Sequence, residues 1–135
     1  MTTNLRAVLG VTLTYVNEEE AADAITPITV ACQYQGQCHG SIDVPASEAA
    51  DTVHTVPFGS VAKASCVVIV NRTAQELEVT INTIDTTMSI PVGGTMVFGS
   101  PTFPAAQHLA SMSLKTTVEQ VAAGKIGFHV FGDAV

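Results

Sequence analysis

The chain has 135 residues, of which 47% are hydrophobic and only 13% are charged. Such a chain can bury a substantial core, which excludes intrinsic disorder and predicts one folded domain over residues 1–135. The formal net charge of −7 argues against nucleic-acid binding, because phosphate neutralisation requires a basic surface. No apolar run approaches the ~20 residues of a membrane-spanning helix, so no membrane partner is expected.

The N-terminal forty residues alternate polar and apolar positions and lack the continuous apolar core of a signal peptide. The alternation predicts one long, half-buried strand over residues 5–16 and another over 28–34. Between them, residues 17–25 could form one or two helical turns capped by Asn17, although so short an isolated helix is marginal in water. We expect these forty residues either to join the domain or to extend from it as an arm that contacts neighbours.

Acidic residues dominate the first half of the chain. Between Arg6 and Lys63 there is no lysine or arginine, whereas seven carboxylates fall there: Glu18, Glu19, Glu20, Asp23, Asp43, Glu48 and Asp51. Runs of like charge usually form solvated loops that keep a protein soluble. The alternative is an acidic patch facing a basic partner, with Glu18, Glu19 and Glu20 as candidate interface residues.

The centre of the chain contains two contrasting apolar patterns. Residues 66–70 are apolar at every position, which predicts a central strand covered on both faces. In 77–81, apolar residues alternate with polar ones, which predicts an amphipathic strand with Leu77, Val79 and Ile81 inward and Glu76 and Glu78 outward. The intervening Asn71-Arg72-Thr73 matches a glycosylation acceptor, but without an export signal we interpret it as the polar bend of a hairpin.

Glycine marks the turns of the second half. Gly93-Gly94 lies between two apolar runs and predicts a two-residue hairpin turn. The dipeptide Phe-Gly occurs at 58–59, 98–99 and 131–132, and each copy is expected to close a strand and turn the chain. Residues 116–124 read as a loop. We count about eight to ten short strands with little or no helix, which predicts an all-β domain: a jelly-roll-like β-sandwich or a small barrel.

No pattern in the chain indicates a catalytic, cofactor or metal site. The histidines (His39, His54, His108 and His129) include no His-x-His pair, and Cys32, Cys38 and Cys66 have no zinc-ligand spacing. Nucleophile and phosphate-loop motifs are also missing, so an enzyme is not expected. An odd number of cysteines favours reduced thiols in a cytoplasm. His129 is predicted on the side of its strand shared with Phe131, where both are candidate subunit-interface residues.

Four segments resemble a family of small virion proteins of tailed bacteriophages. They are the stretch 41–61, the apolar strand running into Asn-Arg-Thr at 67–82, the Gly-Gly run 90–98 and the closing strand 124–133 that ends in Phe-Gly-Asp. Members of this family look like single jelly-roll domains that decorate or cement the capsid exterior, often as trimers. The resemblance implies a homotrimer bound to the major capsid protein on the virion surface, made in the host cytoplasm.

Two other functions stay open at this stage. One is another virion component, such as part of the tail, the baseplate or the base of a head fibre. The other is a shallow glycan-binding module, although the chain has no Trp and few aromatic residues to build a sugar platform. Neither alternative requires catalysis.

Overall fold

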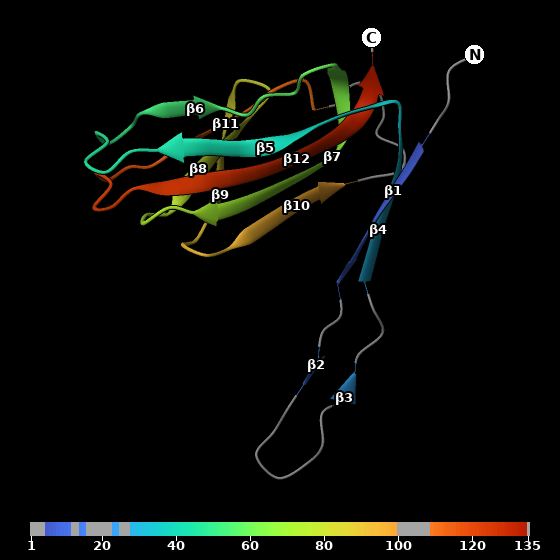
Figure 1. Ribbon diagram of the computed structural model, residues 1–135, viewed down its shortest axis with the longest axis horizontal. Helices are drawn as coiled ribbons and strands as arrows, with labels where there is room; N and C mark the ends of the chain where they lie inside the picture. Colours follow the sequence, from blue (N-terminus) through green and yellow to red (C-terminus); the bar gives the residue numbers. More distant parts are fainter. Residues whose placement is uncertain (1–4, 12–13, 16–22, 25–27, 100–108, 135) are drawn as a thin grey trace.

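The computed structural model describes residues 5–11, 14–15, 23–24, 28–99 and 109–134, with side chains described only from residue 35 onward (Figure 1). No helix occurs in these ranges, which contain twelve strands. The strands are β1 (Leu5–Val11), β2 (Thr14–Tyr15), β3 (Asp23–Ala24), β4 (Ile28–Tyr34), β5 (Gly36–Val44), β6 (Val53–Thr55), β7 (Val61–Arg72), β8 (Leu77–Ile81), β9 (Ile84–Ile90), β10 (Thr95–Gly99), β11 (Met112–Lys115) and β12 (Gly124–Ala134).

Eight of these strands form a β-sandwich, which confirms the predicted class. One antiparallel sheet has the order β10-β7-β12-β5 and is called here the β7/β12 sheet. The other has the order β6-β11-β8-β9 and is called the β8/β11 sheet. The predicted strands at 28–34 and 77–81 coincide with β4 and β8. The small barrel considered as an alternative is not formed, because the two sheets are separate.

Strand pairing in the sandwich is nested. The first strand pairs with the last (β5 with β12), the second with the second last (β6 with β11), and so on to β7 with β10 and β8 with β9. Further pairing of β7 with β12 and of β8 with β11 completes the two sheets. The sandwich is therefore one long antiparallel ribbon folded over on itself.

This nesting corrects two predicted hairpins. Because β7 and β8 belong to different sheets, residues 73–76 form a crossover between the sheets and not the bend of a hairpin. The same holds for residues 91–94, because β9 and β10 also lie in different sheets. Gly93 does adopt a positive φ of 75°, and the Gly94 N–H donates to the Pro91 carbonyl, so the predicted turn forms in a different connection.

The core lies between the two sheets and consists almost entirely of aliphatic side chains. Leu77 and Val79 are each 1% exposed, Ile81 is half-buried and Glu76 is exposed, so the predicted facing of β8 is confirmed. The other buried apolar residues are Val44, Val56, Val61, Ala64, Cys66, Val67, Ile69, Ile90, Leu109, Met112, Leu114, Ile126 and Val130.

Asn71 ties two crossovers together and is fully buried. Its side-chain amide donates to the carbonyls of Gln75 (2.8 Å) and Ile90 (2.9 Å), and its Oδ1 accepts from the N–H and the hydroxyl of Thr73 (2.9 and 2.7 Å). The Asn71 main chain is also bonded to Gly93 and Gly94. An amide enclosed in this way is inaccessible for glycosylation. The role of the Asn71-Arg72-Thr73 triplet is therefore to hold the two crossovers together by hydrogen bonds.

The Phe-Gly dipeptides do not share one role. Gly59 has a φ of 57° and lies in a turn, as predicted. Gly132, in contrast, lies inside β12, which continues to Ala134, and the pairing with β7 shifts register between Phe131 and Gly132. A Cβ at Gly132 would stand 2.1 Å from the Lys63 carbonyl oxygen, so glycine here permits a close backbone approach at a bulge.

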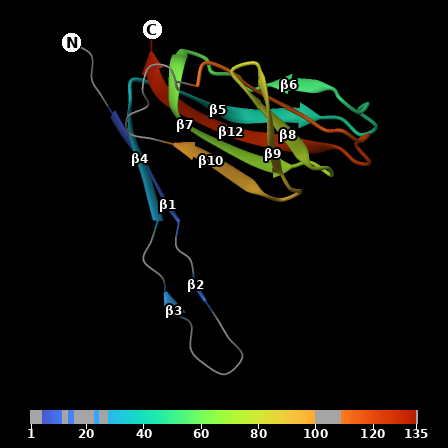
Figure 2. The ribbon, with the colours of Figure 1, turned by 180° about the vertical axis from the view of Figure 1, so that it is seen from behind.

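The N-terminal strands form a ribbon separate from the sandwich. β1 pairs with β4 and β2 pairs with β3, each as a two-stranded antiparallel unit. Figures 1 and 2 show this ribbon projecting from the end of the sandwich near the C-terminus, and we call it the arm. The helical turns considered at 17–25 lie mostly outside the described residues, and the described part, Asp23–Ala24, is strand β3.

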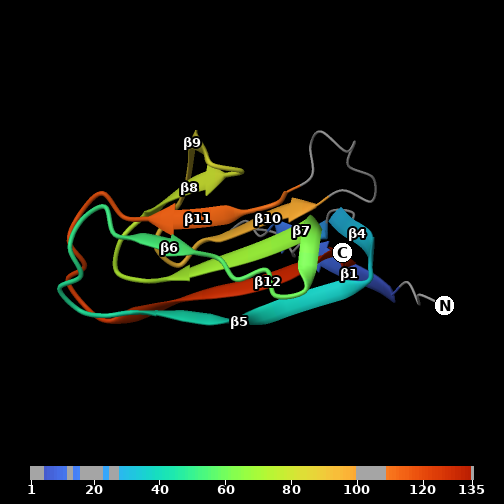
Figure 3. The same cartoon turned by 90° about the horizontal axis from the view of Figure 1, so that it is seen from above.

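Four crossovers meet at the opposite end of the sandwich. Gln120 joins three of them: its carbonyl accepts from Ser47 N–H (2.8 Å), its N–H donates to the Glu48 carbonyl (3.0 Å), and its Oε1 accepts from Ala74 N–H (3.2 Å). The 91–94 crossover is held beside them by Asn71. We call this the crossover end; Figure 3 shows it opposite the chain termini.

Candidate interaction face

The outer face of the β8/β11 sheet is polar. Alternation places a serine, threonine or charged residue at most of its outward positions: Val53, Thr55, Glu78, Thr80, Ser89, Ser113 and Lys115. Lys115 Nζ lies 3.6 Å from Asp51 Oδ1 and 3.9 Å from Glu78 Oε2, and these exposed pairs contribute little to stability. This face has the composition of a surface in contact with water.

The outer face of the β7/β12 sheet is different, and it is the candidate interaction face. Its central outward positions are aliphatic, aromatic or glycine: Val68, Val70, Val97, Gly127, His129 and Phe131. Charged residues lie at the two ends: the register pairs Lys125 with both Arg72 and Asp43 at one end, and Asp133 with Lys63 at the other. A contiguous apolar area on a sheet face marks a candidate contact with another macromolecule.

Gly127 creates a hollow in the middle of this face. The hollow has a volume of about 380 Å³ and is lined by Gly40, Ser41, Val68, Val70, Arg72, Gly127, Phe128 and His129. A Cβ at Gly127 would lie 3.5 Å from the Val70 Cβ, an ordinary van der Waals contact. Local sterics therefore do not require glycine here, and its absent side chain leaves room for an incoming group.

Three rings follow one another across the face. The His39 and His129 ring centroids lie 5.0 Å apart, and the His129 ring stacks on Phe131 at 4.4 Å with an interplanar angle of 21°. The Nε2 atom of His129 is buried without a hydrogen-bond partner. Burial, followed by the proximity of His39, lowers the pKa of His129 from its ordinary value of 6.5. The ring is therefore neutral at pH 7, which suits an apolar contact.

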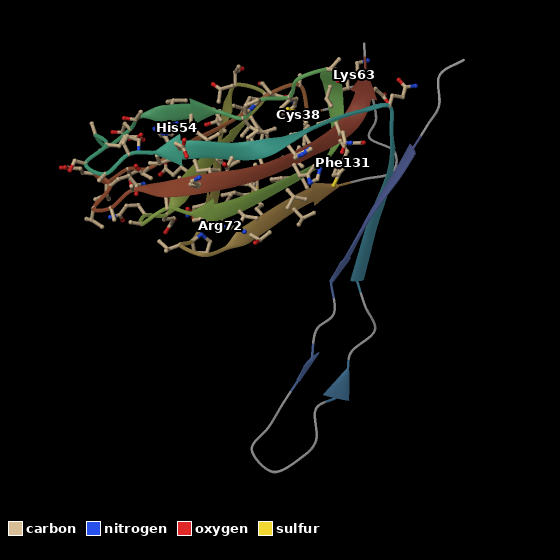
Figure 4. The ribbon with its side chains drawn as sticks, viewed as in Figure 1. Cys38, His54, Lys63, Arg72 and Phe131 are labelled. Carbon is tan, nitrogen blue, oxygen red and sulfur yellow. The ribbon has the colours of Figure 1, made fainter. Side chains whose placement is uncertain are left out.

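One charged end of the face lies toward the crossover end. Arg72 is exposed, and the described residues offer it no ion pair. Lys125 Nζ lies 3.7 Å from Asp43 Oδ1, but both side chains are mostly exposed, so water screens the attraction. Figure 4 shows Arg72 toward the crossover end, whereas Phe131 and Lys63 lie toward the end that carries the arm.

The structure brings together two of the five predicted interface residues. His129 and Phe131 lie side by side on the outer face, as predicted from the alternation in β12. Glu18, Glu19 and Glu20 lie outside the described residues. Sequence reasoning missed Val68 and Val70, because an all-apolar strand was expected to be covered on both faces. β7 is central in its sheet as predicted, and Cys66 in its outer row is buried, but Val68 and Val70 in the same row are half-buried.

The remaining candidate ligands are the His, Cys, Asp and Glu residues of the whole described part of the chain. No group of three or more His, Cys, Asp or Glu residues gathers there in a metal-binding arrangement. His54 Nε2 instead contacts Glu48 Oε1 at 2.6 Å, which ties β6 to the preceding crossover. Cys38 and Cys66 are free thiols, and Cys66 is buried as predicted. None of the described segments is a helix long and apolar enough to cross a bilayer.

No protein-family model, curated protein or solved structure matches the chain.

Proposed function

We propose that this protein is a capsid decoration subunit of a tailed bacteriophage, a homotrimer that binds the major capsid protein on the outer shell and stabilises it without catalysis. The observation that carries the proposal is the division of the surface: one sheet presents a polar face, the other an apolar face with a neutral histidine, and an arm extends from one end. The apolar face and the arm are both surfaces for contact with other proteins, as expected of a structural subunit.

Two further observations support it. The nested pairing of β5 to β12 is the order expected of a jelly roll, the fold that the resemblance to phage virion proteins implies. The hollow on the outer face is lined mostly by aliphatic and backbone atoms and holds no cluster of acid–base groups. We therefore propose the jelly-roll topology and the virion surface as parts of the same hypothesis.

The crossover end is the surface proposed to meet the shell. It exposes valines that have no role in the core: Val92 is 58% exposed, Val118 55% and Val121 77%. Short exposed residues of the same crossovers add to this apolar area, among them Ala46, Ala49, Ala50, Ala122 and Ala123. A subunit that straddles neighbouring capsomers adds contacts present only in the closed shell, and these contacts stabilise that state by linkage.

The test is the resistance of virions with and without the protein. Virions that lack it should release DNA at a lower temperature, and added purified protein should restore resistance. Protein with Val118→Glu and Val121→Glu should fold but fail to restore it, whereas Thr55→Glu, on the polar face, should restore it fully. Equal robustness of heads without the protein would refute cementing.

Localisation separates this function from its alternatives. Gold-labelled antibody should decorate the head of intact virions. Labelling of the tail or baseplate would support the first alternative instead. Binding on a glycan array that is lost when Arg72 or Ser41 is changed to Ala would support the second.

A further inference from the structure

The arm has two unlike rows of paired positions. The register joins Leu5 to Tyr34, Ala7 to Cys32, Leu9 to Val30 and Val11 to Ile28, so every second cross-strand pair is apolar. The intervening pairs are Arg6 with Gln33, Val8 with Ala31 and Gly10 with Thr29, so the second row is mixed. Because directly opposed residues share a face of an antiparallel ribbon, one row of the arm is apolar along its whole length.

Among the described strands, only the sandwich near the base of the arm packs beside it. β4 adjoins β12, β7 and β10 near the base of the arm, whereas β1 has its main contacts with β4 alone among the described strands. Figure 2 shows the arm directed away from the sandwich. A two-stranded ribbon alone is marginally stable in water, and an apolar row normally packs against a second layer.

The outer face of the β7/β12 sheet matches this need. The row in β1 spans seven residues, about 23 Å at ~3.3 Å per residue, which is long enough to cover the stretch of β7 from Val68 to Arg72. Both surfaces are apolar, and the hollow at Gly127 provides space for an inserted side chain. We propose that the arm of one copy lies on the outer β7/β12 face of a second copy of this chain.

Such a contact joins two different surfaces and therefore propagates from copy to copy until it closes into a ring. Each chain then donates one arm and receives another, so both of its apolar surfaces are covered. This inference deepens the homotrimer part of the proposed function by assigning the surfaces through which copies meet. It does not depend on binding to a shell.

The first test changes each surface in the full-length chain and measures its mass by light scattering after size exclusion. Val68→Glu places a charge in the outer face, Gly127→Val fills the hollow, and Leu9→Glu places a charge in the apolar row of the arm. All three should reduce the oligomer to a 14.0 kDa monomer with an unchanged circular dichroism spectrum. Ser113→Glu, at an outward position of the β8/β11 sheet, is the matched control and should leave the mass unchanged.

The second test traps the contact between arm and face with a disulfide, so it does not depend on weakening the oligomer. In the double variant Leu9→Cys/Val68→Cys, mild oxidation should produce covalent multimers on a non-reducing gel. The control Leu9→Cys/Ser113→Cys and the unmodified chain report the background from the native cysteines. A disulfide within single chains would show that the arm folds back on its own sheet, and would overturn the proposal.

The remaining outcomes are equally decisive. A monomeric unmodified chain, or an oligomer that survives all three changes, refutes the exchange. Loss of the oligomer in Val68→Glu but not in Leu9→Glu would show that something other than the arm occupies the face, and refutes it too. An oligomer held by arm exchange that fails to bind heads would refute only the cementing function.

Discussion

At the scale of single residues, the buried polar and glycine positions carry more structural information than the core aliphatics. The Asn71 side chain donates to the carbonyl of Gln75, in the crossover that follows β7, and to that of Ile90, at the end of β9. A buried acceptor left without a donor costs about 1–3 kcal/mol, so one side chain that serves several acceptors is difficult to replace. This explains an asparagine at the end of an otherwise aliphatic strand.

Asn71→Ala should lower the free energy of unfolding by about 3 kcal/mol or more, because it removes several buried hydrogen bonds at once. Arg72→Ala, one position along and exposed, should change it by no more than about 0.5 kcal/mol. Urea denaturation curves provide both values. Similar midpoints for the two variants would show that the Asn71 network contributes little.

Two glycines of β12 offer a second matched comparison. Gly132→Ala should destabilise the protein by about 1–3 kcal/mol or more, because its Cβ would overlap the Lys63 carbonyl oxygen, a backbone atom that cannot rotate away. Gly127→Ala should be neutral or stabilising, because its Cβ meets only an ordinary contact and alanine loses less chain entropy on folding. Thermal melts of the two variants measure the contrast, and a reversed order would place the bulge elsewhere.

His129 should make stability depend on pH. Its pKa is lowered in the folded state, so at mildly acidic pH the unfolded chain binds more protons at this residue than the native chain does. Its contribution is therefore fully present above its unfolded pKa of about 6.5 and is lost as pH falls below that value.

Unfolding midpoints at pH 7.5 and pH 5.5 check this. The unmodified chain should lose more stability on acidification than His129→Phe, which keeps a ring stacked beside Phe131 but cannot titrate. Equal losses in the two proteins would assign the pH dependence to other groups.

At the scale of elements, each strand of the sandwich has two rows of side chains. The inner row is apolar because it packs against the other sheet, whereas the polarity of the outer row depends on what surrounds it. In β8 the outer row meets water, and in β7 it is aliphatic and half-buried. The same alternation therefore yields an amphipathic strand in one sheet and an all-apolar one in the other.

Val79→Ala should cost about 1–3 kcal/mol, because it removes two buried methyl groups and leaves a cavity between the sheets. Glu78→Ala, on the outer row, should stay within about 0.5 kcal/mol, because its contact with Lys115 is solvent-exposed. A denaturant series should separate the two clearly. Equal effects would mean that β8 is displaced by one residue, which would exchange its faces.

At the scale of the whole molecule, the two ends of the sandwich differ. One end gathers four crossovers and exposed valines, and the other carries the arm and the C-terminus. Because the two ends differ and the outer β7/β12 face is apolar, each surface can contact a different neighbour, either another copy of the chain or another protein.

The full-length chain should therefore be an oligomer at micromolar concentration, with a mass about three times 14.0 kDa in light scattering. The physical reason is that no described strand covers the centre of the outer β7/β12 face or most of the arm in a single chain. A stable monomer under these conditions would contradict the prediction.

The sequence by itself determined the all-β class and the inward residues of β8. Both depend on the period of two, a local property that any strand pairing preserves. It also located the bends at Asn71 and Gly93, because turn chemistry is local.

Only the tertiary structure decided which strands pair across those bends. A short connection can close a hairpin or cross to the other sheet, and the choice depends on partners distant in sequence, such as β12 for β7. The same reason explains Gly132, whose need for glycine comes from the Lys63 carbonyl on a neighbouring strand, and the outer valines of β7. Val68 and Val70 stay half-buried because no third layer of described strands covers them, which no local pattern encodes.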